Sequence, residues 1–217
     1  SRETIESVEQ YCKTMGKVVI VCKDRPGFVV NRFFVPWINE ACHLLQEGVA
    51  TAAQIDAVAC DSFRIGLGPF ALMNLTGPAI ALHSSDYLCE QLSVERFRGA
   101  DNLRELVESG GPWDVEGDQG CDEATASKIT DRLMGQVFAV CSQIVEEGIC
   151  SMEDVDRGAK VGLRWTIGPF EIANRIGIQE ASRMADSYSA LAGLEVPAWF
   201  SGREGPFDFS YVDVDVE

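Results

Sequence analysis

An amide and a guanidinium stand side by side at the start of an apolar segment. Residues 23–33 read KDRPGFVVNRF, where Arg-Pro-Gly forms a turn ahead of an apolar run that carries Asn31 and Arg32. An asparagine side chain offers a hydrogen-bond donor and an acceptor without a charge. Near the start of a helix it either bonds to the local backbone or faces a cleft. The residues alone leave both interpretations open.

Other catalytic and cofactor patterns are weak. His43 and His83 are the only histidines, and neither has partners at metal-ligand spacing. The run Gly66-x-Gly68-x-x-Ala71 has the spacing of a dinucleotide fingerprint, but no predicted strand precedes it and no βαβ unit surrounds it. The eight cysteines form no CxxC pair and fall mostly in apolar helical patterns, which predicts buried thiols in a reducing cytoplasm. No cofactor or metal site is predicted within these residues.

Composition narrows the class of partner. The net charge is −16, with 34 acidic and 18 basic residues. This charge disfavours a nucleic-acid partner, because phosphate binding needs clustered Lys and Arg. No apolar run approaches the ~20 residues that span a bilayer, and no signal-type leader begins the chain. We interpret the acidity as a solvated surface.

An internal duplication is the strongest signal. Residues 47–77 match residues 147–177 at a constant offset of 100, with 10 identities in 31 positions, where chance gives roughly two. Glu47-Gly48 recurs as Glu147-Gly148, and the GPF triplet at 68–70 recurs at 168–170.

Each copy has the pattern of a helical unit. Apolar residues between Val30 and Leu45 keep the i, i+3, i+4, i+7 spacing of a buried helix face. Gly48 is placed to end that helix, and Thr51 to cap the next one. Gly68-Pro69 opens another, because proline is tolerated at the first helical position. The second copy repeats this order from Ala126 onward.

The ends differ from the middle. Residues 2–15 predict an amphipathic helix, the β-branched run KVVIVCK (17–23) predicts a strand, and 207–216 also predict a strand. The fold class is therefore mainly α, with two tandem helical repeats and short β fragments at both ends. The predicted divisions are 1–24, copy one (25–107), a Gly- and acid-rich linker (108–124), copy two (125–196) and 197–217.

The motifs resemble those of one enzyme family. One motif closely resembles the 3-hydroxyacyl-CoA dehydrogenases at the junction between their nucleotide-binding and helical domains: KDRPGFVVNR, which follows a predicted GKVVIV strand. Two later segments resemble the helical domain of the same family: EGVAT..QID and GPF..MN..G. The resemblance covers nearly the whole chain, with the helical domain present twice. It implies a fold of the 6-phosphogluconate-dehydrogenase C-terminal-like type.

The resemblance also implies a function. Residues 1–24 then correspond to the last helix and strand of a Rossmann domain that binds NAD and carries a catalytic His–Glu pair. Asn31 takes the place of the family asparagine that lies near the reacting oxygen of the acyl-CoA substrate. An uncharged amide there supports the developing carbonyl without competing with the histidine for its proton. Its counterpart in copy two is Asp131, whereas Arg32 and Arg132 occur in both copies, which favours a structural ion pair.

Two further expectations follow from the family pattern. Single-copy members pair their helical domains in a dimer, so copy two should occupy the partner's place, with 30–46 packed near 130–146 about a pseudo-twofold axis. The tail 197–217 resembles the linker and opening strand of a crotonase-like domain, as in fused β-oxidation enzymes. The chain departs from the family at SGGPWDVEG, where single-copy members carry a Gly- and Lys-rich segment, so no cofactor-contacting lysine is assigned.

Two alternatives stay open beside the leading hypothesis of an (S)-3-hydroxyacyl-CoA dehydrogenase. One is a non-catalytic helical scaffold that kept the fold and lost the activity. The other is the helical domain of a different β-hydroxyacid dehydrogenase.

Overall fold

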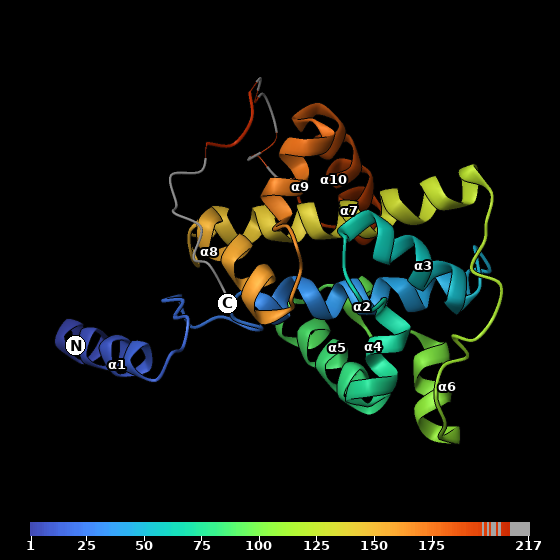
Figure 1. Cartoon of the computed structure of the whole chain (residues 1–217), viewed down its shortest axis with the longest axis horizontal. Helices are drawn as coiled ribbons and strands as arrows, with labels where there is room; N and C mark the ends of the chain where they lie inside the picture. The colour runs from blue at the N-terminus through green and yellow to red at the C-terminus, as the bar shows by residue number, and fades with distance from the viewer. Residues whose placement is uncertain (197, 199, 201–202, 204, 209–217) are drawn as a thin grey trace.

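The computed structural model describes residues 1–196, 198, 200, 203 and 205–208, and its regular elements are helices (Figure 1). The first copy and its flanks contain α1 (Arg2–Thr14), α2 (Val30–Gln46), α3 (Ala52–Phe63), α4 (Pro69–Thr76), α5 (Pro78–Leu92), the 3₁₀ turn η1 (Glu95–Phe97) and α6 (Asp101–Ser109). The second contains α7 (Glu123–Glu146), α8 (Met152–Arg157), the π-helical turn η2 (Gly158–Gly162), α9 (Pro169–Ile176) and α10 (Ile178–Ala192). The predicted mainly helical fold is confirmed. In the described residues no helix is long and apolar enough to cross a membrane.

The predicted helix ends form as the residue types dictate. Gly48 and Gly148 take positive φ values of 69° and 60° just after α2 and α7, a backbone region that glycine adopts without steric cost. Thr51 caps α3 in a reciprocal capping box with Gln54, and Ser151 caps α8. Local sequence therefore sets the same turn in both copies.

A buried aspartate fixes the GPF corner of each copy. The Asp56 carboxylate accepts bonds of 2.8 Å from the backbone N–H groups of Phe70 and Ala71, at the start of α4. Asp156 does the same at the start of α9. A side chain on Gly68 would place its Cβ 2.4 Å from the Asp56 Cγ, so this position must be glycine.

A second pair of matched contacts lies after each unit. The Asn74 side chain forms two hydrogen bonds with the backbone of Trp113, and Asn174 forms the same two with Phe207. Trp113 and Phe207 each meet the GPF phenylalanine edge-on, at 5.0 Å between ring centroids. The segment GPWD (111–114) and the segment GPFD (205–208) are thus structural counterparts.

The two copies pack through α2 and α7, which lie side by side in Figure 1. Trp165 of copy two enters an aromatic cluster of copy one, with ring centroids 4.9 Å from Phe63, 5.7 Å from Trp37 and 5.8 Å from Phe33. The buried Gln136 amide donates to the Phe33 carbonyl at 3.1 Å. The packing predicted between 30–46 and 130–146 is confirmed.

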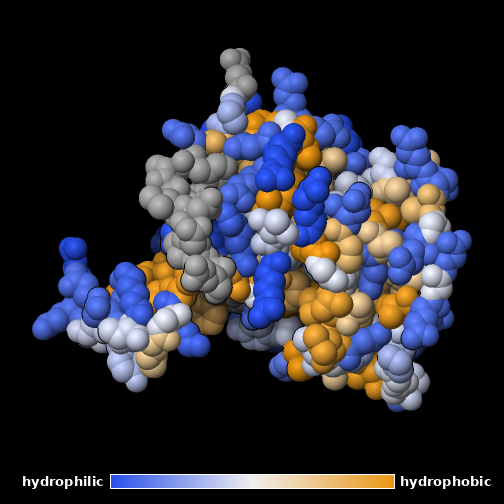
Figure 2. All heavy atoms as spheres, in the orientation of Figure 1, coloured by the Kyte–Doolittle hydropathy of each residue, from blue (hydrophilic) through white to orange (hydrophobic). Residues whose placement is uncertain are grey.

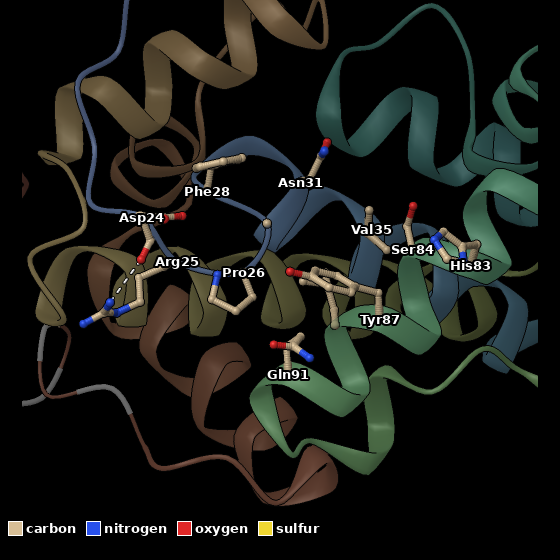
Figure 3. Close-up of a pocket in the computed structure, with 12 residues that line it drawn as sticks. Asp24, Arg25, Pro26, Phe28, Asn31, Val35, His83, Ser84, Tyr87 and Gln91 are labelled. Atoms are coloured by element: carbon tan, nitrogen blue, oxygen red, sulfur yellow. Dashed lines mark hydrogen bonds between the residues drawn. The ribbon is translucent and has the colours of Figure 1, made fainter. Parts of the chain in front are cut away.

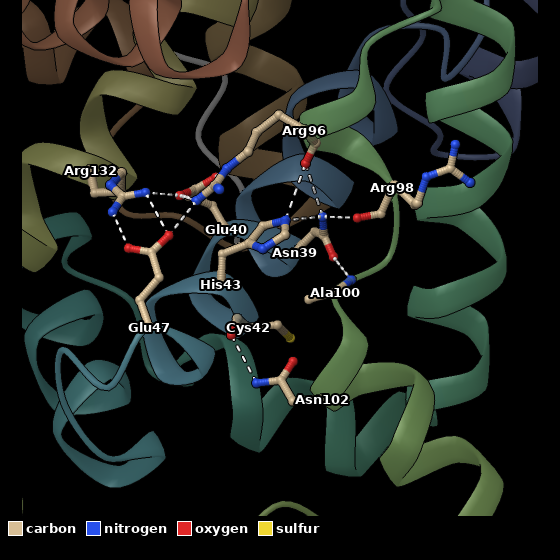
Figure 4. A network of polar contacts seen from close by, with 10 residues as sticks. All are labelled: Asn39, Glu40, Cys42, His43, Glu47, Arg96, Arg98, Ala100, Asn102 and Arg132. Atoms are coloured by element: carbon tan, nitrogen blue, oxygen red, sulfur yellow. Dashed lines mark hydrogen bonds and ion pairs between the residues drawn. The ribbon is translucent and has the colours of Figure 1, made fainter.

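Charged groups also bridge the copies (Figure 4). Glu40 is 1% exposed and accepts from Arg96 at 2.6 Å and from Arg132 of copy two at 2.8 Å. Arg96 and Arg132 both reach Glu47 as well, at 3.0 and 2.5 Å. The network satisfies a carboxylate that would otherwise be costly to bury.

The strand predicted over 17–23 is not formed. These residues have no regular secondary structure, although the Lys23 N–H donates to the Ile149 carbonyl at 3.0 Å. A strand requires a neighbouring strand for its ladder, and the described residues provide none. The predicted helix before it is confirmed as α1, whose Ile5, Val8 and Tyr11 are exposed. Most of the second predicted strand, 207–216, lies outside the described residues.

Candidate functional site

The turn ahead of α2 is built by Pro26, Gly27 and Phe28. The Phe28 N–H donates to the Arg25 carbonyl at 2.9 Å, and the Arg32 N–H donates to the Gly27 carbonyl at 3.1 Å. Gly27 has a φ of 76°, and a Cβ on it would lie 2.8 Å from the Arg32 backbone. The PGF sequence thus folds the chain tightly onto the first turn of α2 and fixes where Asn31 emerges.

The Asn31 side chain is exposed and has no hydrogen-bond partner in the described part of the chain. The Asn31 amide therefore does not bond to the local backbone, which was one of the two interpretations that the sequence left open. Asn31 lines a hollow of about 560 Å³, and Figure 3 shows its amide directed away from Pro26 and Gln91. Its donor and acceptor are free for a ligand.

The hollow lies between α2 and α5. The loop 24–28, Asn31 and Val35 form one side, and His83, Ser84, Tyr87 and Gln91 of α5 form the other (Figure 3). Sequence reasoning missed the α5 residues as site members. The i, i+4 spacing of residues 83, 87 and 91 places them on one helix face, and this spacing could have identified them as a group.

Copy two has different groups at the equivalent positions. Asp131 replaces Asn31, and Arg183 replaces His83. Arg183 donates to the Asp131 carboxylate at 2.8 Å, so the side chain equivalent to Asn31 is already paired. Gly135, the counterpart of Val35, lets α10 pack directly on α7, since a Cβ there would lie 2.4 Å from the Met184 carbonyl oxygen. The free amide belongs to copy one alone.

Arg32 is buried and does not line this hollow. It is 4% exposed and pairs with Glu147 at the end of α7. Burial lowers the pKa of the Arg32 guanidinium, and the Glu147 carboxylate acts in the opposite sense. The structural ion pair predicted for this arginine is confirmed.

Neither histidine belongs to a metal cluster. Among the described residues no group of three or more His, Cys, Asp or Glu side chains is arranged to hold a metal ion. His43 instead faces the Arg96 carbonyl at 3.3 Å and the Asn39 amide at 3.2 Å. Burial, and then the charge of Arg96, lowers the pKa of His43. Gly68 follows helix α3, so the glycine fingerprint lacks the strand that nucleotide binding requires.

Comparison with known proteins identifies the fold's family. Residues 27–120 and 129–198 match the family described as "3-hydroxyacyl-CoA dehydrogenase, C-terminal domain". The chain belongs to this family. The match falls on both copies, and it includes Gly27, Asn31 and both GPF corners.

Individual relatives agree with this assignment. A fatty acid oxidation complex subunit alpha of Vibrio campbellii is 29% identical over 228 aligned positions, which covers 89% of this chain and 32% of that protein. The mitochondrial hydroxyacyl-coenzyme A dehydrogenase of Mus musculus is 42% identical over 77 residues, 36% of this chain and 24% of that protein. The chain therefore spans a third or less of these relatives. The crystal structure of 3-hydroxybutyryl-CoA dehydrogenase from Escherichia coli K12 superposes with a TM-score of 0.75 at 17% identity, covering 90% of this chain and 62% of that one, and so shares the fold.

Proposed function

We propose that this chain is the substrate-side and assembly domain of an NAD-dependent enzyme that oxidises (S)-3-hydroxyacyl-CoA to 3-ketoacyl-CoA in fatty-acid β-oxidation. The observation that carries the proposal is the unpaired Asn31 amide at the rim of the hollow between α2 and α5. Family membership supports the reaction class.

Asn31 would hold the C3 oxygen of the substrate. Oxidation converts the C3 alcohol to a carbonyl, so the oxygen changes from a donor into an acceptor. A primary amide offers both functions and carries no charge, so it can donate to the forming carbonyl without binding the departing proton. The tight PGF turn and the Arg32–Glu147 pair hold the first turn of α2 in place, which keeps the amide preorganised.

The hydride acceptor and the base would come from another domain. NAD, when bound, accepts the hydride, and the described residues contain no βαβ unit to hold it. We infer that residues 1–24 close a Rossmann domain in the same protein, which would cover the exposed apolar side of α1. A crotonase-like domain after 197–217 is the corresponding inference for the other end, and it rests on the resemblance of that tail to the opening of such a domain. A cytoplasmic location fits eight free cysteines.

The test is an assay with acetoacetyl-CoA and NADH. The longer protein that carries this chain should oxidise NADH, and the purified 217-residue chain should not. Turnover by the 217-residue chain alone would disprove the proposal that another domain supplies NAD binding and the base. A longer protein that binds NAD and acyl-CoA but never turns over would favour the non-catalytic scaffold.

A further inference from the structure

An apolar groove starts one helical turn from Asn31. It encloses about 590 Å³ and is lined by Phe34 and Trp37 of α2, by the loop after α3 and by α4. Phe34 follows Asn31 at i+3, so the two side chains are neighbours on the helix surface. Phe34 in turn stacks on Trp37, with ring centroids 5.9 Å apart. The half-buried Phe34 ring, backed by the buried Trp37, therefore lies between Asn31 and the groove.

The groove is apolar and open. Leu67 and Leu75 at its rim are 47% and 73% exposed, and Figure 2 shows apolar side chains gathered over the α4–α5 region. Arg164 is the one charged residue in the lining. The α2–α5 hollow on the other side of Asn31 contains Asp24, Arg25 and other polar groups. Asn31 thus lines a hollow of mixed polarity and lies one helical turn from an apolar groove.

Copy two supplies the far wall of the groove. Gly162, Leu163 and Trp165 come from the π-helical turn η2 and the loop after it. The equivalent residues of copy one, 58–62, form regular α-helix within α3. A Cβ on Gly158 would lie 2.8 Å from a Val30 methyl carbon, so η2 is fitted against the residue that precedes Asn31. Single π turns of this kind are frequent at functional sites.

We propose that this groove binds the acyl chain of the substrate, beginning just beyond the carbon held at Asn31; this inference rests on the proposed function. The thioester end lies toward the α2–α5 hollow, which contains the charged Asp24 and Arg25, and the hydrocarbon tail follows Phe34 toward Leu75. Copy two is then part of the substrate site as well as a replacement for a dimer partner. Leu163 and Leu75 become chain-length determinants, because each methylene that the groove buries improves affinity about fourfold.

Direct binding to the 217-residue chain tests the groove. Titration with dodecanoyl-CoA, kept below its micelle concentration, should change the tryptophan fluorescence, because Trp37 and Trp165 line the groove. Butanoyl-CoA should bind at least about tenfold more weakly. Leu75→Asp should weaken dodecanoyl-CoA binding about tenfold or more and leave butanoyl-CoA binding unchanged. Gly66→Leu should do the same by filling the groove, since a Cβ there meets open space.

The matched control is Leu191→Asp, which alters an exposed leucine on α10, outside the groove. It should leave both affinities unchanged. Equal binding of the two acyl-CoA esters, or dodecanoyl binding that neither groove variant weakens, would overturn the inference and leave the proposed reaction standing. The proposed reaction is tested separately, by measuring turnover in the longer protein.

Discussion

The Arg132 guanidinium of copy two lies 2.5 Å from the Glu47 carboxylate of copy one. The same pair occurs with the copies exchanged, because Arg32 of copy one binds Glu147 of copy two. In a symmetric dimer, residue i of one subunit contacts j of the other, and j contacts i in return. This chain shows that reciprocity within one polypeptide, so the contact between its two copies has the form of a twofold interface.

Loss of Arg132 should be costly. Arg132→Ala leaves the buried Glu40 with Arg96 as its remaining arginine partner, which should lower the free energy of unfolding by about 2–3 kcal/mol. Arg183→Ala is the matched control, because its partners Glu180 and Asp131 are far more exposed than Glu40, and it should cost less than about 1 kcal/mol. Urea titration measures both. Equal losses would show that the buried network contributes no more than a surface pair.

Asn31 should matter for rate and not for folding. Its side chain is exposed and unbonded in the described structure, so Asn31→Ala should leave the unfolding free energy within about 0.5 kcal/mol of the original. In the longer enzyme kcat should fall about 10²–10³-fold, as when one donor to a developing oxyanion is removed. Asn31→Asp should be at least as damaging, because a carboxylate repels that oxygen. Unchanged kcat in both variants would remove Asn31 from the mechanism.

The sequence predicted what depends on local pattern. The caps at Thr51 and Ser151 and the helix starts at Gly68-Pro69 and Gly168-Pro169 were predictable because each follows from a few adjacent residues. Asn31 was readable because it stands in a recognisable motif. The strand over 17–23 was predicted wrongly, since a strand's existence depends on partners that the pattern of one segment does not reveal.

Features that depend on tertiary packing could not be predicted from the sequence. The contribution of Tyr87 and Gln91 to the hollow depends on how α5 crosses α2. The match between Trp113 and Phe207 was hidden because their offset is 94, whereas the duplication keeps an offset of 100 elsewhere. The groove between the copies depends on η2, and no simple spacing rule predicts such a π turn from sequence.

Stability should decline below about pH 6.5 through His43. Burial lowers the pKa of His43 in the folded protein, so the unfolded chain binds the proton more readily. The stabilising contribution is complete above the unfolded pKa of 6.5 and is lost as the pH falls toward the folded value. His43→Gln should therefore reduce the loss of unfolding free energy between about pH 7.5 and about pH 5.5. His83→Gln, which alters an exposed residue on α5, should not change that loss, and the hypothesis fails if the two variants behave alike.

The segment 205–208 should be part of copy two. Asn174→Ala removes two hydrogen bonds to the backbone of the buried Phe207 and should cost about 1–3 kcal/mol, as Asn74→Ala should in copy one. Gln179→Ala, at an exposed position on α10, should cost less than about 0.5 kcal/mol. Thermal unfolding compares the three. A neutral Asn174→Ala beside a destabilising Asn74→Ala would show that copy two does not depend on this segment.

Copy one should not remain monomeric by itself. A chain cut after residue 120 loses α7 and Trp165, which cover Phe33, Trp37 and Phe63 in the intact protein. It also loses Arg132, which pairs with Glu47 and the buried Glu40. An apolar face of more than a few hundred Å² favours self-association, and a twofold interface offers a second copy of the same fragment as the natural partner. Light scattering should therefore find the 1–120 fragment as a dimer or larger species, while the intact chain keeps these residues covered within one molecule. A folded, monomeric 1–120 fragment would mean that the two copies are independent units and that their reciprocal arginine–glutamate pairs add nothing essential.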